Sequence, residues 1–176
     1  MCLLLILKAY FLLTSCTLLT KMKQNGAMMK AILLLHGPNL NMLGLREPGV
    51  YGSMTLEEIN QRAMELGREI GLEIRVLQSN HEGVLIDALH DAKNWAAGVV
   101  FNPGGYTHTS VALRDAISAI SIPVVEVHLS NVYAREEFRH KSLVSAVCRG
   151  KISGFGWRSY LLGFQALSDI IGEAAP

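Results

Sequence analysis

Short, continuously apolar runs alternate with stretches of helical periodicity from residue 30 to the end of the chain. The runs lie at residues 31–35, 73–78, 98–101, 124–129 and 151–155. They contain too few polar positions for strands with one face in water, so we expect both faces of each to be buried. The pattern therefore predicts a central sheet built from these runs.

Amphipathic helices are predicted between the strands. The first begins with a capping box at Thr55 and Glu58, in which each side chain satisfies a free amide at the helix start. Its apolar residues follow at helical spacing and form one stripe: Leu56, Ile59, Ala63, Leu66 and Ile70. A second capping box is predicted at Ser79 and Glu82, ahead of another apolar stripe.

Three more helices complete the pattern. One is predicted over residues 107–119, capped near Thr107–Thr109, and a short one lies within residues 134–145. The last spans residues 157–171, and its inward positions are Tyr160, Leu161, Phe164, Leu167 and Ile171. A β–α unit repeated in this way predicts a parallel, doubly wound sheet of the α/β class. No repeat or linker divides it, so we expect one domain over residues 30–176.

Residues 1–29 precede this pattern and do not follow it, and we interpret them as an N-terminal extension. The segment is rich in leucine, but Lys8 divides its apolar run into pieces shorter than the ~20 residues that a spanning helix needs. Residues 13–16, ending in Cys16, resemble a lipoprotein cleavage box, which leaves a membrane-tethered protein as an alternative. We favour translated upstream sequence, with the native start at Met28 or Met29.

Composition narrows the class of protein. Half of the 176 residues are apolar and the formal net charge is +1, without a basic block, which argues against a nucleic-acid partner. The three cysteines, Cys2, Cys16 and Cys148, have neither disulfide nor zinc-site spacing. We therefore expect a reduced, cytoplasmic protein without a membrane partner.

Polar side chains gather where the predicted strands end. Open parallel sheets bind ligands beyond the carboxyl ends of their strands, so we expect a site for a polar ligand there. The candidates in chain order are His36, Asn39, Asn41, Arg46, Tyr51, Ser79, Asn80, His81, Asn102, Thr107, His108, Glu126, His128, Ser130, Asn131, Arg135 and Arg139.

Several kinds of chemistry find little support in the sequence. The phosphate-loop patterns GxGxxG and GxxxxGK[ST] are absent, although Gly104-Gly105 before a helix could hold an anion. A metal site made of His81, His108, His128 and Glu126 stays open but has no helical pair of histidines. Lysines stand at strand starts or near helices, which disfavours a Schiff base.

Acid–base chemistry remains, and the stretch REPGVYG at residues 46–52 suggests its base. A tyrosine normally titrates near pH ~10, but a nearby arginine stays protonated and lowers the pKa of the phenol. Arg46 could therefore make Tyr51 a base. The alternatives are that Tyr51 only fills space at a loop end and that Arg46 pairs with Glu47. Loop 44–53 contains three glycines that can serve as hinges, Gly44, Gly49 and Gly52, so we expect the loop to act as a lid.

Three stretches resemble type II 3-dehydroquinate dehydratase: residues 37–52, 102–116 and 126–142, reading GPNLNMLGLREPGVYG, NPGGYTHTSVALRDA and EVHLSNVYAREEFRHKS. The resemblance extends from residue 30 to about residue 170, in the family's order and spacing. It implies a flavodoxin-like sheet with strand order 2-1-3-4-5. It also implies reversible dehydration of 3-dehydroquinate to 3-dehydroshikimate, without metal or organic cofactor, in the shikimate pathway or in quinate catabolism.

The resemblance further implies a role for each matching residue. Tyr51 would remove the C2 proton as a phenolate tuned by Arg46. Asn102 would hold the water or oxygen that steadies the enolate, with Asn39 close by. His108 would protonate the departing C1 hydroxyl in an anti elimination, and Glu126 would orient the His108 imidazole.

Substrate binding and assembly follow from the same resemblance. His128 and Arg139 would hold the ring hydroxyls, while Ser130 and the main-chain amides of Leu129 and Ser130 would bind the carboxylate. Asp115 would reach the site of a neighbouring subunit, because trimers of the family associate into a dodecamer. The remaining rival is a flavodoxin-like module that binds FMN or another anion without turnover; His36 and His81 are interpreted as structural.

Overall fold

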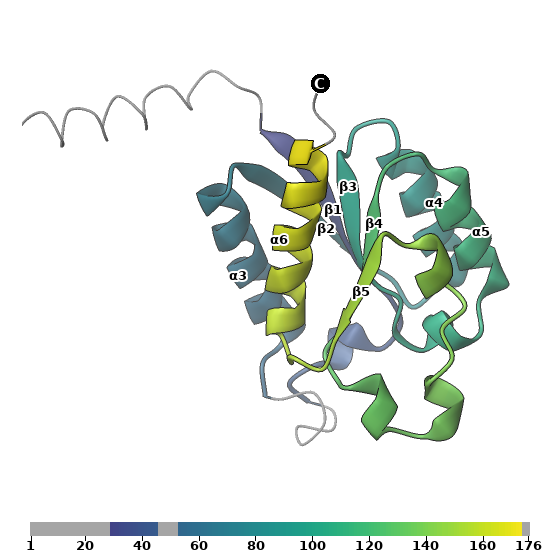
Figure 1. Cartoon of the computed structure of the whole chain (residues 1–176). Helices are drawn as coiled ribbons and strands as arrows, with labels where there is room; N and C mark the ends of the chain where they lie inside the picture. The colour runs from purple at the N-terminus through teal and green to yellow at the C-terminus, as the bar shows by residue number, and fades with distance from the viewer. Residues whose placement is uncertain (1–28, 46–52, 174–176) are drawn as a thin grey trace, which may run out of the picture.

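The computed structural model describes residues 29–45 and 53–173, which form three layers around a parallel sheet (Figure 1). The order of the strands across the sheet is β2-β1-β3-β4-β5, and every pairing is parallel. The bounds are Lys30–His36 for β1, Leu72–Gln78 for β2, Gly98–Asn102 for β3, Val124–His128 for β4 and Gly150–Ser153 for β5. The predicted flavodoxin-like fold and its strand order are confirmed.

Four α-helices cover the two faces of the sheet. Helices α3 (Leu56–Glu69) and α6 (Arg158–Glu173) lie on one face, and α4 (Glu82–Ala92) and α5 (Val111–Ala119) lie on the other (Figure 1). The short 3-10 helices of the described residues are η2 (Leu40–Met42), η3 (Gly104–His108), η4 (Val132–Ala134), η5 (Glu137–Arg139) and η6 (Ser145–Val147). No helix in the described ranges is both long and apolar enough to cross a membrane.

Alternate residues of β1 supply two separate cores. Ile32 and Leu34 pack toward α3 and α6, whereas Leu33 and Leu35 pack toward α4 and α5. All are at most 3% exposed, which explains why the strand is apolar without interruption. Gly163 brings α6 close to the sheet, because a Cβ at this position would lie 2.8 Å from Cγ1 of Val127.

One predicted helix cap is confirmed. The Thr55 hydroxyl accepts a hydrogen bond from the amide of Glu58 (3.2 Å), and the Glu58 carboxylate accepts one from the amide of Thr55 (2.8 Å). The inward positions Tyr160, Phe164 and Leu167 of α6 are buried as predicted, along with Ile171, whereas Leu161 is only partly buried.

Two other predicted caps are wrong. Ser79 accepts from the amide of His81 within the loop (2.9 Å), and His81 precedes α4 without a side-chain cap. Helix α5 begins after Ser110, whose hydroxyl accepts from the amide of Leu113 (2.8 Å). The 3-10 helix η3 occupies the residues where the predicted helix was to start.

The short helix predicted within residues 134–145 is a 3-10 helix, η5, rather than an α-helix. Residues 140–144 after it are non-helical, and η6 begins at Ser145. The C-terminal part of the segment is fixed by tertiary hydrogen bonds, since the amide of Leu143 donates to the carbonyl oxygen of Thr107 (2.8 Å). Together with the contact of Lys141 to His108, this bond holds the segment against η3.

Candidate active site

A pocket of about 200 Å³ opens at the carboxyl ends of β1, β3 and β4. The predicted catalytic and binding residues on its walls are Asn39, Asn102, His108, His128, Leu129, Ser130 and Arg139. Arg135 and the glycine pair Gly104-Gly105, which the sequence also singled out, line it too. The pocket is therefore polar and positively charged at the edge of the sheet where a doubly wound fold binds ligands.

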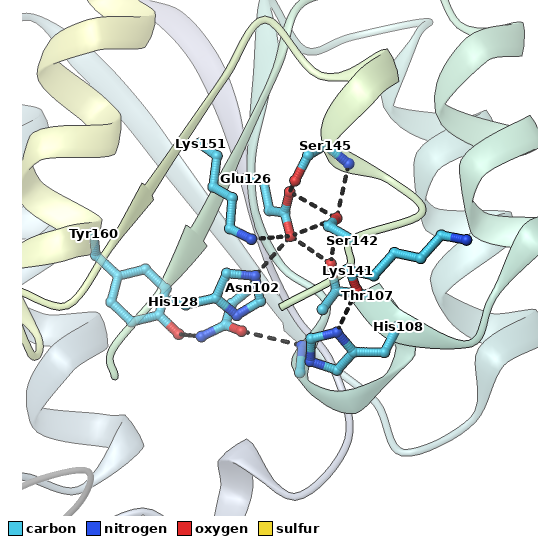
Figure 2. A network of polar contacts seen from close by, with 11 residues as sticks. Asn102, Thr107, His108, Glu126, His128, Lys141, Ser142, Ser145, Lys151 and Tyr160 are labelled. Carbon is cyan, nitrogen blue, oxygen red and sulfur yellow. Dashed lines mark hydrogen bonds and ion pairs between the residues drawn. The ribbon is translucent and has the colours of Figure 1, made fainter. Parts of the chain in front are cut away.

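Glu126 and His128 form the buried centre of this site, because residues two apart on β4 point to the same side (Figure 2). His128 Nε2 lies 2.6 Å from Glu126 Oε1, and Glu126 is fully buried. Since a carboxylate only accepts, Nε2 carries the proton of this hydrogen bond, and Nδ1 of His128 is left for other partners.

Further donors surround the Glu126 carboxylate. The hydroxyls of Thr107 and Ser145 donate to it, and Ser142 lies 3.4 Å from both carboxylate oxygens. Lys151 Nζ is 3.9 Å from Oε1. Burial alone raises the pKa of Glu126, but the hydrogen bonds from His128, Ser145 and Thr107 and the charge of His128 together lower it to about 2. Glu126 is therefore an anion at neutral pH.

His108 lies at the end of η3 and is partly buried. Its Nδ1 is 2.8 Å from the carbonyl oxygen of Lys141, so Nδ1 carries a proton and Nε2 is the atom that exchanges one. Burial lowers the pKa of His108, the hydrogen bond to Lys141 opposes this, and the charges of His128, Arg139 and Lys151 lower it further.

The predicted contact between Glu126 and His108 is wrong. The carboxylate contacts His128, while a backbone carbonyl fixes His108. The reason is the alternation of the strand, which places residue 128, two positions along β4, beside Glu126. His108 comes from η3 and is fixed by the 140–143 segment instead.

Asn102 ends β3 and is 2% exposed, with its amide at the pocket wall. Its Nδ2 donates to the Tyr160 hydroxyl (2.8 Å), and its Oδ1 accepts from the amide of Gly104 (3.1 Å) (Figure 2). The second proton of Nδ2 and the second lone pair of Oδ1 remain for a ligand.

The rim of the pocket is formed by the loops after β1 and β4. Asn39 adopts a left-handed backbone conformation (φ 64°), and its amide donates to Oδ1 of Asn80 (2.8 Å). Across the pocket, Glu136 holds Arg139 through a 2.8 Å ion pair and lies 3.5 Å from Nε of Arg135. The two guanidinium groups make this rim suited to an anionic ligand.

The described lining of the pocket does not include every predicted site residue. Tyr51 and Arg46, with most of the predicted lid, fall outside the described residues. Asp115 is exposed on α5 and does not line the pocket of its own chain. Within residues 29–45 and 53–173, no group of three or more His, Cys, Asp or Glu side chains is arranged to hold a metal ion.

Sequence reasoning missed the groups behind the pocket. Ser142, Ser145 and Lys151 converge on Glu126 together with the candidate Thr107, and Tyr160 contacts Asn102. A signal existed for Lys151, because the register of β4 and β5 places it directly beside Glu126. Ser145 and Tyr160 had no such signal, since tertiary packing alone brings them to the site.

A larger, open groove of about 790 Å³ lies at the opposite, amino-terminal edge of the sheet. Aliphatic side chains such as Ile117, Ile120 and Ile170 form much of its wall, with Lys30, Arg149 and Glu173. It has no histidine, asparagine or tyrosine among its lining residues, so the smaller pocket is the better candidate for chemistry.

The fold and the pocket together define a class: a doubly wound α/β protein with histidine and asparagine side chains around a polar pocket at the carboxyl edge of its sheet. Residues 30–168 match the family described as dehydroquinase class II. The chain belongs to this family. The recognition made from the sequence is confirmed, and with it the assignment to a family of carbon–oxygen hydro-lyases.

Relatives and solved structures agree with this assignment. The chain is 60% identical over 140 residues to the 3-dehydroquinate dehydratase of Trichodesmium erythraeum, covering 80% of this chain and 93% of that protein. It is 59% identical over 143 residues to that of Rhizobium etli, covering 81% and 99%. The crystal structure of type II dehydroquinase from Butyrivibrio crossotus superposes with a TM-score of 0.78 at 43% identity, covering 80% of this chain and 99% of that one.

Proposed function

We propose that this protein reversibly dehydrates 3-dehydroquinate to 3-dehydroshikimate by acid–base elimination through an enolate. Membership of the class II dehydroquinase family supports the reaction. The observation that carries the mechanism is the histidine at the pocket: Nδ1 of His108 is fixed by a carbonyl oxygen, which leaves Nε2 to deliver a proton.

The first step breaks the C2–H bond next to the ketone. Tyr51, as a phenolate, takes the proton, and the electron pair of the bond becomes the enolate. Arg46 lowers the pKa of the phenol so that the phenolate exists at neutral pH. Asn102, with Asn39 near it, holds the water or oxygen that stabilises the enolate charge.

The second step breaks the C1–O bond. The enolate electrons form the conjugated double bond, and the departing hydroxide takes the Nε2 proton of His108 and leaves as water. The lowered pKa of His108 makes its imidazolium a stronger acid, which favours this transfer. Base and acid act from opposite faces of the ring, as an anti elimination requires. Proton exchange with solvent then restores both groups.

The remaining pocket residues bind the substrate. Arg139 and His128 hold the ring hydroxyls, with Glu126 fixing the orientation of His128 through the 2.6 Å contact. Ser130 and the main-chain amides of Leu129 and Ser130 bind the carboxylate. These four proposed binding residues line the described pocket.

No Schiff base takes part in the proposed reaction. The residues described around the pocket include no lysine, and Lys151 Nζ is directed to the Glu126 carboxylate. Lys151 is therefore engaged by a buried carboxylate and is not among the residues that line the pocket.

Assembly is part of the proposal. Trimers associate into a homododecamer, and Asp115, which is exposed on α5, reaches the site of a neighbouring subunit. Light scattering tests this directly, since a monomer in solution would contradict it. We also propose a cytoplasmic catalytic domain over residues 30–176 after an extension at 1–29; mass spectrometry of the native N-terminus and cell fractionation test these points.

One assay tests the reaction. The purified protein is mixed with 3-dehydroquinate, and the ultraviolet absorbance of the conjugated enone product is followed before and after borohydride treatment. Turnover that survives borohydride is expected, because no imine forms. Inactivation by borohydride would contradict the mechanism. No turnover, together with visible flavin absorbance, would favour the FMN-binding module instead.

A further inference from the structure

A chain of four buried side chains runs from the protein interior to Asn102. Asn102 Nδ2 is 2.8 Å from the Tyr160 hydroxyl, which is 3.1 Å from His36 Nδ1. His36 Nε2 is in turn 2.9 Å from Oδ1 of Asn60. Tyr160 and His36 are fully buried, and Asn102 and Asn60 are at most 9% exposed. Water therefore has little access to this chain.

Each proton of the chain can be assigned from its partners. The Asn102 nitrogen can only donate, so the Tyr160 oxygen accepts from it. The Tyr160 hydroxyl then donates its one proton to Nδ1 of His36, which must be bare. The ring proton of His36 therefore sits on Nε2 and is donated to Asn60. This is the arrangement in which every buried donor has an acceptor.

The titration of the buried groups favours the same arrangement. Burial lowers the pKa of His36 to about 4, against the opposing hydrogen bond to Asn60, so that Nδ1 stays free to accept at neutral pH. Burial also raises the pKa of Tyr160 well above its usual range, against the hydrogen bond from Asn102, so its hydroxyl keeps its proton. Both side chains, His36 and Tyr160, are therefore neutral at neutral pH.

The Asn102 amide is thereby held in one of its two orientations. The amide of Gly104 donates to Oδ1 (3.1 Å), while Tyr160 accepts from Nδ2. Rotating the amide by half a turn would set Nδ2 against the N–H of Gly104. The Tyr160 hydroxyl would then donate to Asn102 instead of His36. Nδ1 of His36 would become a buried acceptor without a donor, which costs about 1–3 kcal/mol.

We propose that Tyr160 and His36 are positioning residues, which fix the Asn102 amide so that it presents a nitrogen-bound proton to the reacting oxygen. The inference rests on the proposed function, because Asn102 is the residue that acts on the enolate there. Neither Tyr160 nor His36 lines the pocket, so both act only through Asn102.

The test is a double-mutant cycle. Tyr160→Phe removes the hydroxyl and nothing else, and we expect kcat per folded site to fall about 10- to 100-fold from misplacement of Asn102. KM should change less than about threefold, since the loss falls on the transition state. In an Asn102→Ala background, Tyr160→Phe should have almost no further effect. Unchanged kcat, or the same loss in both backgrounds, would overturn the proposal.

A matched control separates positioning from stability. Phe164 lies one turn after Tyr160 on α6 and is equally buried. Phe164→Leu should lower the free energy of unfolding by about 1 kcal/mol while leaving the kcat of folded enzyme unchanged. If Tyr160→Phe does not fold, His36→Leu replaces it, because this variant removes the acceptor of the Tyr160 proton. A wild-type kcat in folded His36→Leu would then refute the positioning role of these hydrogen bonds.

A readout independent of turnover distinguishes this inference from the proposed function. In protein labelled with ¹⁵N-asparagine, the Asn102 side-chain signals are identified by their loss in Asn102→Ala. They should shift in Tyr160→Phe and not in Phe164→Leu. Unshifted signals would overturn the positioning role. A wild-type protein that does not dehydrate 3-dehydroquinate would overturn the proposed function, even if the signals shift as expected.

Discussion

Lys151 stands beside Glu126 in the register of β5 and β4, and its Nζ lies 3.9 Å from Oε1 of the buried carboxylate. The lysine side chain is only 17% exposed. A cation is thus built into the sheet behind the pocket, where it balances the negative charge of Glu126 and its charge acts on His108.

Replacing Lys151 should change the acidity of His108. The charge of Lys151 contributes to the lowered pKa of His108, so Lys151→Met should raise that pKa. The alkaline limb of the kcat/KM profile should then move to higher pH, because the acid keeps its proton longer. NMR titration of the His108 ring measures the change. Lys30→Met at the far edge of the sheet is the control, and a His108 pKa that responds equally to both variants would contradict this explanation.

Removing the charge of Glu126 should destabilise the fold. Glu126→Gln leaves Lys151 without a counter-charge and places an amide among hydroxyl donors. The free energy of unfolding should fall by about 3–5 kcal/mol, as for other broken buried pairs. Chemical denaturation measures it. The control is Glu73→Gln, whose ion pair with Arg75 is about half exposed and should contribute below about 1 kcal/mol. Equal losses in the two variants would argue against a buried anion at position 126.

The proposed base is tested by Tyr51→Phe. Without a phenolate the C2 proton has no acceptor, so kcat should fall by about 10²- to 10⁴-fold while substrate still binds. Steady-state kinetics and calorimetric binding measure the two quantities. Tyr133→Phe, at a tyrosine 66% exposed, should behave as wild type. Turnover close to wild type in Tyr51→Phe with intact binding would refute the role.

The proposed acid is tested by His108→Ala. This variant removes the proton that the departing hydroxide needs, so kcat should fall by a similar factor of about 10²- to 10⁴-fold. His81→Ala is the matched control, because His81 precedes α4 and does not line the pocket. A His108→Ala variant that keeps most of the wild-type kcat would show that the proton comes from elsewhere.

Acid should weaken the fold through His36. Because its folded pKa is depressed from 6.5 to about 4, the unfolded chain binds the proton more tightly. The stabilisation is complete above pH 6.5 and is lost as the pH falls toward 4, by up to about 3 kcal/mol. The free energy of unfolding is measured between these pH values. His36→Gln should show a shallower dependence, and identical slopes would mean that His36 does not titrate as described.

The sequence predicted the sheet because β1, β3 and β4 are buried on both faces and are therefore mostly apolar. The expectation that every strand is buried on both faces is wrong for β2, where Glu73 and Arg75 are exposed, and for β5, which is only partly buried. Residues 31–35 and 98–101 lie within β1 and β3. The sequence also predicted the pocket residues, because they end strands or lie in the loops after strands whose carboxyl ends share one edge of the sheet. Asn102, His108 and His128 are examples.

The sequence did not predict what depends on distant contacts. The cap at Ser110 follows from η3, and the non-helical 140–144 segment is held by the hydrogen bond from Leu143 to Thr107. These two features are decided by packing, which local propensity does not encode. The partner of Glu126 was misassigned although strand alternation already places His128, two residues along β4, on the same side as Glu126.

The strand that carries Lys151 is the last to be synthesised and occupies the edge of the sheet. While a nascent chain still lacks β5, the carboxylate on β4 has no ammonium beside it. Docking of the final strand therefore both closes the core and supplies the missing charge. Catalytic competence should appear only when the C-terminal quarter of the protein has left the ribosome and folded.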